Sequence, residues 1–233
     1  MKNLISVIAL LFTLTSFGQS NAVVTNNMTG EMIQRASNSH LSSFGSSATF
    51  FNPKRNVEGS VHLFPEWNNR GVIITNEGQK FGLNNININI ERNTFEARIS
   101  QDTLFTFNFN NIDRFVINNR VFKNFYYGND NRIFELIYES KDVTIMKGHR
   151  VQLVEGSANP MVNRKNDKYV QKSSIFVKHG NKIENFKLNK KKVLGLFNDS
   201  EKIKKIEDYA NSNRLSFKKA EDVKKMLSLG LQQ

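Results

Sequence analysis

The sequence predicts a mainly β protein of the α+β class, in which an antiparallel β meander is followed by two to three short C-terminal helices. Short apolar runs recur roughly every ten residues between residues 59 and 188, with turn residues between them. Many of these runs alternate apolar and polar residues, as strands with one buried face do. After Leu188 the apolar period changes from two to about 3.6 residues, which is the period of a helix.

A hairpin is expected near the start of the β unit, after a first candidate strand at 60–64. Two apolar runs, 71–75 and 79–83, flank Asn76-Glu77-Gly78, a turn sequence that suits paired strands. The other candidate strands follow in chain order: 86–90, 95–99, 105–109, 114–117, 121–127, 133–139, 143–146, 170–178 and 182–188. This spacing is typical of a sandwich, a roll or an open barrel.

The alternation of apolar and polar residues within the strands predicts which side chains are exposed to solvent. Ile86 and Ile88 alternate with Asn87 and Asn89, so the asparagines are expected on a solvated face. His62 stands between Val61 and Leu63, and the same argument places it on the exposed side of a strand.

Three short amphipathic helices are expected at the C-terminal end. Asn189, then Asp199 or Ser200, and then Ser216 are residue types that favour N-cap positions. Asn213 suits the left-handed conformation that often ends a helix. Helices this short need a surface to pack on, and the β unit is expected to supply it.

The N-terminus has the pattern of a secretory signal. Lys2 precedes an apolar run from Leu4 to Leu14, and the small residues Ser16 and Gly18 suit a cleavage site after Gly18. The run is shorter than the roughly 20 apolar residues that a spanning helix needs. We therefore expect export across the inner membrane, to a periplasmic, outer-membrane-associated or extracellular location, with no transmembrane segment after signal cleavage.

Four segments follow from these patterns. They are a signal peptide at 1–18, a flexible Asn/Ser-rich arm at 19–58, an antiparallel β domain at 59–188, and a basic amphipathic helical segment at 189–233 that packs on the β unit.

Composition narrows the class of protein further. The chain has no cysteine, which excludes a lipid-modified N-terminal cysteine, disulfide bonds and thiolate metal sites. The formal net charge is +12 and the isoelectric point about 9.8, so acidic partners are favoured. We predict an envelope protein, an anionic lipid or an acidic glycan as the partner. No nucleic acid is expected, because export removes the protein from the chromosome.

The lysines of the helical segment are the first candidate binding residues. Five of them lie on the faces that the apolar stripes leave free: Lys190, Lys191, Lys192, Lys204 and Lys205. They could contact an acidic surface, but acids stand among them, and a solvated face with helical ion pairs explains the same pattern. Trp67, beside Phe64 and Glu66, is the second candidate, as a platform on which a sugar ring could stack.

Candidates for catalysis are few. Glu135 and Glu139 are four residues apart in a predicted strand, hence on one side of it, and paired carboxylates can hydrolyse glycosides. The alternative is that both balance nearby cations such as Arg132 and Lys141. The four histidines lie far apart without metal-ligand spacing. The sequence therefore predicts no catalytic residue, no metal site and no cofactor.

Three stretches resemble a group of secreted β-rich proteins that recur in Bacteroidetes and end in a Lys-rich helical segment. These stretches are GSVHLFPEW at 59–67, LNNININIERNTFEARI at 83–99, and the tail from 186 to 227. The resemblance implies an exported β-rich fold. It carries over no catalytic residue.

Together these observations predict a secreted or periplasmic, non-enzymatic envelope protein with a binding or scaffolding role. Two alternatives stay open: a carrier that encloses a small apolar ligand in its Phe-rich β unit, and a secreted hydrolase that uses Glu135 and Glu139.

Overall fold

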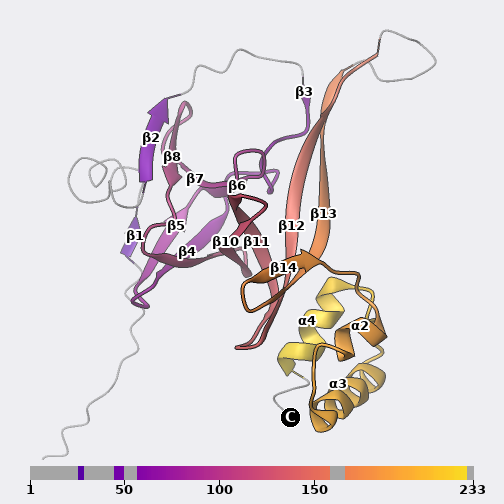
Figure 1. The fold of residues 1–233 in the computed structure, drawn as a ribbon. Coiled ribbons are helices and arrows are strands. Elements are labelled where there is room, and N and C mark those ends of the chain that lie inside the picture. Colours follow the sequence, from indigo (N-terminus) through magenta and orange to yellow (C-terminus); the bar gives the residue numbers. More distant parts are fainter. Residues whose placement is uncertain (1–25, 29–44, 50–56, 158–165, 230–233) are drawn as a thin grey trace, which may run out of the picture.

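The structure is a computed structural model, and it describes residues 26–28, 45–49, 57–157 and 166–229. Two β-sheets and three short helices make up this part of the chain (Figure 1). The predicted fold class is confirmed: the protein is mainly β, the two sheets do not close into a barrel, and the helices lie at the C-terminal end.

The large sheet contains ten strands of the described chain. Their order is β1-β5-β4-β9-β10-β11-β12-β13-β14, and β3 pairs with β13 outside this path. The strands are β1 Asn26–Met28, β3 Val57–Glu58, β4 Arg70–Thr75, β5 Lys80–Asn84, β9 Ile112–Ile117, β10 Arg120–Tyr127, β11 Asp130–Glu139, β12 Val143–Val154, β13 Asp167–His179 and β14 Lys182–Asn185. From β9 to β14 each strand is antiparallel to the next, which is the predicted meander.

The small sheet has the order β2-β8-β7-β6 and is antiparallel throughout. Its strands are β2 Gly45–Thr49, β6 Ile86–Asn89, β7 Thr94–Arg98 and β8 Thr103–Phe107. Strands β1, β2 and β3 fall in the range 19–58 that the sequence assigns to an arm. Each pairs with the β unit, β1 and β3 in parallel, while the rest of that range lies outside the described residues.

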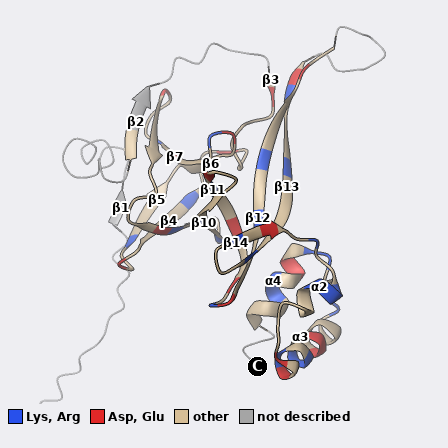
Figure 2. Cartoon of the chain, viewed as in Figure 1, with Lys and Arg blue, Asp and Glu red and all other residues tan. Residues whose placement is uncertain are grey.

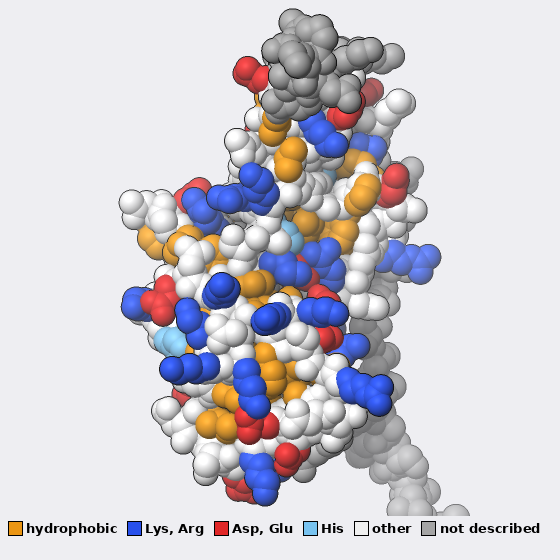
Figure 3. All heavy atoms as spheres, turned by 90° about the vertical axis from the view of Figure 1, so that its right-hand side faces the viewer, with side chains coloured by type: hydrophobic (Ala, Val, Ile, Leu, Met, Phe, Trp, Pro, Cys, Tyr) orange, Lys and Arg blue, Asp and Glu red, His pale blue; other side chains and the backbone are white. Residues whose placement is uncertain are grey.

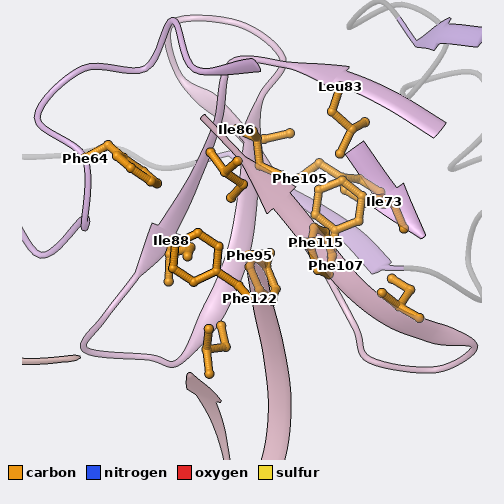
Figure 4. Packing of buried hydrophobic residues seen from close by; sticks show 14 residues of the cluster. Phe64, Ile73, Leu83, Ile86, Ile88, Phe95, Phe105, Phe107, Phe115 and Phe122 are labelled. Carbon is orange, nitrogen blue, oxygen red and sulfur yellow. The ribbon is translucent and has the colours of Figure 1, made fainter. Parts of the chain in front are cut away.

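The core lies where the inner faces of the two sheets meet. Phe95 of the small sheet and Phe115 of the large sheet are fully buried and stack with their ring centroids 3.6 Å apart. Phe122 meets Phe95 edge to face, and the surrounding aliphatic side chains fill the space between the sheets (Figure 4). Aromatic side chains bury large apolar areas, so this cluster supplies much of the stability of a domain without disulfides.

The prediction that Asn87 and Asn89 lie on a solvent-exposed face of their strand is wrong. Asn87 is fully buried and Asn89 is 3% exposed, although the isoleucines between them do face the core as predicted. The reason is that residues 59–69 fold back over the edge of β6 and cover this side. The candidate strand at 60–64 forms only one isolated bridge, between His62 and Asn89.

Asparagines shape many of the turns. Six of the seven non-glycine residues with positive φ in the described chain are asparagine, and two of them, Asn118 and Asn119, form the tight turn between β9 and β10. Asparagine tolerates this left-handed conformation better than most residues. The abundance of asparagine in the sequence therefore has a structural role at the strand connections.

The three helices are α2 Lys190–Leu194, α3 Ser200–Ser212 and α4 Ala220–Leu229. The predicted N-caps Asn189 and Asp199 are confirmed, since their side chains accept hydrogen bonds from backbone N–H groups of the first turn. The left-handed residue after α3 is Arg214 rather than the predicted Asn213.

A second apolar cluster joins these helices to the large sheet. Val193, Ile206 and Val223, one from each helix, are fully buried with Ile137 and Ile145 of the sheet. The helices therefore pack on the β unit as predicted, and they lie at the opposite end of the large sheet from the small sheet (Figure 1).

A β-bulge in β11 overturns the predicted placement of the two glutamates. Glu135 lies opposite Lys147 of β12, and Glu139 lies opposite Thr144, with the register shifting between Leu136 and Tyr138. Residues that lie opposite each other in a sheet point to the same side, and Lys147 and Thr144 are three apart in a regularly paired strand. Glu135 and Glu139 thus point to opposite faces of the sheet.

The stacked phenylalanines give a stability test. Replacing Phe95 with Ala should lower the free energy of unfolding by about 3–5 kcal/mol, because it removes a buried ring and leaves a cavity between the sheets. Urea unfolding measures this change. Tyr126 is 69% exposed, and its replacement with Ala should change the value by no more than about 0.5 kcal/mol. Equal effects of the two substitutions would contradict the assigned core.

Candidate functional site

A groove on the outer face of the small sheet brings together charged, polar and aromatic side chains. We call it the Trp67 groove, and it has a volume of about 420 Å³. Its lining residues are Val61, His62, Trp67, Asn89, Glu91, Arg92, Arg98, Gln101, Asp102 and Leu104. They come from the 59–69 segment, the end of β6, the β6–β7 turn, β7, the β7–β8 turn and the start of β8.

Backbone hydrogen bonds to β6 hold one wall of the groove in place. Leu63 N–H donates to the carbonyl of Ile88 at 2.9 Å, and Ile90 N–H donates to that of Val61 at 2.8 Å. The side-chain amide of Asn87 reaches the same segment, because its Oδ1 accepts from Phe64 N–H and its Nδ2 donates to the Phe64 carbonyl. The segment is thus an extra edge of the small sheet rather than a free loop.

Gly59 makes the approach of this segment feasible. Its φ is +80°, a conformation that suits glycine, and a Cβ at this position would lie 2.8 Å from the backbone oxygen of Tyr169 in β13. Further along, Gln171 Nε2 donates to the carbonyls of Ser60 and His62, the latter at 2.6 Å. The wall of the groove is therefore fixed to the large sheet as well as to β6.

Glu96 is the buried anchor of the site. Its side chain is fully buried, and its carboxylate binds His62 Nε2 at 2.9 Å, Thr94 Oγ1 at 3.0 Å and the guanidinium of Arg92. Burial by itself raises the pKa of Glu96, but the His62 hydrogen bond and the charge of Arg92 outweigh it, so the pKa lies below its usual range. Glu96 therefore stays ionised and orients His62 and Arg92.

This arrangement fixes the hydrogen on His62. An ionised carboxylate only accepts hydrogen bonds, so Nε2 of His62 carries the hydrogen that it donates to Glu96. The other ring nitrogen, Nδ1, lies 3.3 Å from Ser60 Oγ, which also accepts the backbone N–H of His62 at 3.0 Å. Ser60 is not among the residues that line the groove, so we assign it to holding the imidazole and not to attacking a substrate. The prediction that His62 is solvated is wrong: its side chain is 16% exposed and bonded at both nitrogens.

Trp67 lines the groove, is half-buried, and has two neighbours at its ring. The guanidinium of Arg98 lies 4.3 Å from the ring centroid, and the His62 ring meets it edge to face at 4.7 Å. No acidic side chain of the described chain forms an ion pair with Arg98, and its partial burial lowers the pKa of its guanidinium. The ring predicted to stack on a sugar thus supports a cation that is open to an anionic ligand.

Two carboxylates stand on the rim of the same groove. Glu91 and Asp102 are both exposed, and Gln101 lies next to Asp102. The groove therefore offers cationic donors together with acidic and amide acceptors. Such a mixture can bind an anionic group together with hydroxyl groups.

Glu135 belongs to a separate cluster on the large sheet. Arg120 binds its carboxylate with two hydrogen bonds of 2.9 and 2.6 Å, and His149 Nε2 lies 3.0 Å away, with Lys147 at 3.6 Å. Burial raises the pKa of Glu135, but His149 and Arg120 more than compensate and hold it far below its usual range. A carboxylate so strongly ionised cannot donate a proton near neutral pH, so its role in the structure is to bind cations.

Glu139 takes part in a different ion network, on the other face of the sheet. It lies 3.0 Å from Lys123 and 3.2 Å from Arg114, and both of these cations also bind Asp113. The prediction that nearby cations neutralise both glutamates is therefore correct. The cations that do so are not Arg132 and Lys141, which the sequence suggested. The two carboxylates do not form a pair.

The predicted lysine surface lies on α2 and α3. All five lysines are exposed, and Lys190 pairs with Glu207 of α3 at 2.9 Å. Lys204 is three residues before Glu207, on the same side of α3. The helix α2 carries lysines and no acidic residue, whereas α3 carries both basic and acidic side chains (Figure 2). Over one face of the molecule the basic side chains stand apart, with apolar and acidic ones between them (Figure 3). The five lysines therefore lie on a solvated surface of mixed charge, and none of them lines the Trp67 groove.

Two further properties of the described residues bear on the site. No group of three or more histidine, aspartate or glutamate side chains in this part of the chain is placed to hold a metal ion. None of its helices is both long and apolar enough to cross a membrane.

Comparisons with known proteins add no identity. No family model matches the chain, and neither a curated protein nor a solved structure matches it at a significant level. The resemblance to secreted proteins of Bacteroidetes stays a prediction.

Sequence reasoning found Trp67 but missed Glu96 and Arg98 as its neighbours. Glu96 was hidden in an alternating strand whose polar side looked solvated. The signal that could have found it is the pair Arg92 and Glu96, four residues apart, with Arg92 in the turn and Glu96 opposite Asn87 of the preceding strand.

Glu135 gives a test of these electrostatics. Replacing it with Gln should lower the free energy of unfolding at pH 7 by about 2–3 kcal/mol, because Arg120 and Lys147 lose a largely buried anion. A depressed carboxyl pKa contributes stability above the unfolded pKa, near 4.5, and this contribution is lost as the pH falls below it. The difference between wild type and Glu135→Gln should therefore be constant above about pH 5 and shrink toward pH 2.

Urea unfolding at several pH values measures this difference. Glu77→Gln, at an exposed turn, is the matched control and should have little effect at any pH. A difference that grows on acidification would refute the assigned role of Glu135.

Proposed function

We propose that this protein is an exported, non-enzymatic binding protein of the cell envelope, and that its ligand is an acidic glycan held in the Trp67 groove. The observation that carries the proposal is the guanidinium of Arg98, which forms no ion pair within the described chain and lies over the Trp67 ring in a groove with hydrogen-bonding side chains. Export rests on the N-terminal sequence pattern.

The stacked guanidinium is suited to a carboxylate of the ligand. Arg98 rests one face on Trp67, so the N–H groups at its edge are free to make a bidentate contact. Because Trp67 limits the rotation of Arg98, less side-chain entropy is lost on binding. His62, held by Glu96, also contacts the Trp67 ring, edge to face, and helps to keep this arrangement in place.

The rest of the groove suits the hydroxyl groups of a sugar. Asp102 and Gln101 present acceptors, and an amide also presents donors, as sugar hydroxyls require. The volume of about 420 Å³ lies within the range of small-molecule sites, about 300–1,000 Å³. Among the partners that the sequence suggests, an acidic glycan fits better than a lipid, because most residues that line the groove are polar or charged.

The two alternatives have less support. A carrier of apolar ligands needs an enclosed cavity, whereas aromatic and aliphatic side chains fill the space between the two sheets. A hydrolase that uses Glu135 and Glu139 needs a pair of carboxylates across one substrate, whereas these two lie on opposite faces of β11.

Arg98 gives the direct test. Wild-type protein should bind a uronic acid oligosaccharide, such as an oligogalacturonate, more tightly than the methyl-esterified form, which lacks the charge. Arg98→Gln should weaken binding of the acidic form by about 10- to 100-fold, the cost of a charged hydrogen-bonding pair, and titration calorimetry measures it. Arg70→Gln, at an exposed position, is the matched control and should bind like wild type.

Two results would overturn this ligand assignment. One is equal affinity for the acidic and esterified oligosaccharides across a panel of uronic acids. The other is unchanged affinity of Arg98→Gln for whichever acidic glycan the wild type binds.

Export has its own test. The full chain expressed in a Gram-negative host should appear outside the inner membrane, and its intact mass should correspond to a mature chain that begins near Gln19. A variant without residues 1–18 should remain in the cytoplasm. Full-length protein in the cytoplasm would contradict the export part of the proposal without affecting the glycan site.

A further inference from the structure

The strands β12 and β13 form an arm that extends beyond the rest of the large sheet (Figure 1). The pairing of β12 with β11 ends at Gly148 opposite Phe134, whereas its pairing with β13 continues to Val154 opposite Lys168. Six residues of β12, 149–154, thus have a strand on one side only within the described chain. Unpaired edges of this kind readily accept another strand.

The opposite edge of the arm, formed by β13, is occupied in part. The strand β3 pairs with β13 at Asp167 and Lys168, and Gln171 binds the backbone of the segment that follows β3. Nearer the helices, β14 pairs with β13. Within the described chain, residues 149–154 of β12 therefore have no strand partner on their outer side, whereas the β13 edge is paired near both of its ends and bonded at Gln171.

The side chains of this edge have a pattern that suits contact with another chain. Leu153 is 41% exposed, one of three large hydrophobic residues of the described chain that are that open. Val151 points to the same side as Leu153, while Arg150 and Gln152 point to the other side and are exposed. An isolated two-stranded ribbon is marginally stable in water, so an additional strand would stabilise the arm.

We propose that a second copy of this chain occupies the edge, with the two β12 strands antiparallel about a two-fold axis at Gln152. A two-fold axis perpendicular to the sheet leaves every side chain on the face of the sheet where it already lies. Two residues that oppose each other across the axis must therefore differ by an even number in sequence position. Centred on Gln152, Val151 opposes Leu153 of the second copy, and the two Gln152 amides face each other. The edge is therefore complementary to itself.

The charge of Arg150 favours the pairing centred on Gln152 over the pairing centred on Val151. Arg150 is the only charged residue among 150–154, and centring on Gln152 places it opposite Val154 of the second copy. The two Arg150 positions are then four residues apart along the strands, about 13 Å, which exceeds the Debye length of about 8 Å at physiological salt. Centring on Val151 would bring the two arginines to diagonal positions, about 7–8 Å apart, where they repel.

The inference does not depend on the glycan site.

A single cysteine at the axis tests the proposal directly. The chain has no cysteine, so Gln152→Cys carries the sole thiol. Directly opposed residues in an antiparallel pair have Cα atoms about 4.5–5.5 Å apart, within the range that a disulfide bridges. Mild oxidation should convert most Gln152→Cys protein to a covalent dimer, measured on a non-reducing gel over time.

The control lies on the same arm. Lys172 is exposed and opposes Arg150 across the arm, but it belongs to β13 and not to the β12 edge at which the second copy is placed. Lys172→Cys should form dimers at least tenfold more slowly than Gln152→Cys. A mixture of Val151→Cys and Leu153→Cys should give more heterodimer than either variant gives homodimer, because the register opposes these two positions.

Association of the unmodified mature chain gives an independent measurement. Sedimentation equilibrium should show a monomer–dimer equilibrium, and Leu153→Lys should raise the dimer dissociation constant at least tenfold with an unchanged circular dichroism spectrum. Tyr126→Lys, at the most exposed large hydrophobic residue, should leave it unchanged. A wild-type chain that stays monomeric up to 0.2 mM, or equal crosslinking of Gln152→Cys and Lys172→Cys, would overturn the proposal.

Discussion

The buried side chain of Asn87 connects the core of the protein to its candidate binding site. Its amide oxygen accepts the N–H groups of Phe64 and Ile88, and its amide nitrogen donates to the carbonyls of Phe64 and Glu66. These bonds satisfy the backbone of the 59–69 segment at the place where it covers the edge of β6. The same bonds direct Phe64 against Phe122 in the core and leave His62 and Trp67 over the outer face of the small sheet.

The two buried glutamates show how a basic protein uses its few acids. Glu96 and Glu135 are each surrounded by a histidine and at least one arginine, and both carboxyl groups have a lowered pKa. A buried carboxylate without cations would be costly, so each cluster has to form as a unit. Glu135 holds three strands of the large sheet together, whereas Glu96 orients residues that a ligand can reach. The same chemistry therefore serves stability in one place and preorganisation in the other.

The sequence predicted what depends on local pattern. The alternation of Phe and Ile in the strands, the hairpin at Gly78 and the caps Asn189 and Asp199 are all local, and all are present. What it could not predict depends on contacts between distant residues. The exposure of Asn87 depends on a segment about 23 positions earlier in the chain. That this segment covers Asn87 can be seen only in the folded structure.

Only part of the candidate site was predicted, because its other residues also depend on contacts between distant positions. Trp67 was selected from its residue type alone, since one tryptophan beside acidic and aromatic neighbours suggests binding. Its cation Arg98 comes from β7, and the carboxylate that fixes His62 is 34 positions away from it. The bulge in β11 was equally hidden, because one extra residue reverses the side of Glu139 without changing the apolar pattern enough to be seen.

The arm and the Trp67 groove are coupled through one side chain. Gln171 of β13 donates to the carbonyl of His62, and Gln171 lies opposite Val151, which is on the free edge of β12. A two-stranded ribbon bends and frays more readily than a wider sheet, so the position of Gln171 is only as fixed as the arm. A strand added to β12 would restrict the arm, and through Gln171 it would restrict the backbone that carries His62 and Trp67. Because a preorganised site loses less entropy when it binds, assembly at the edge of β12 would strengthen binding in the groove without any new contact to the ligand.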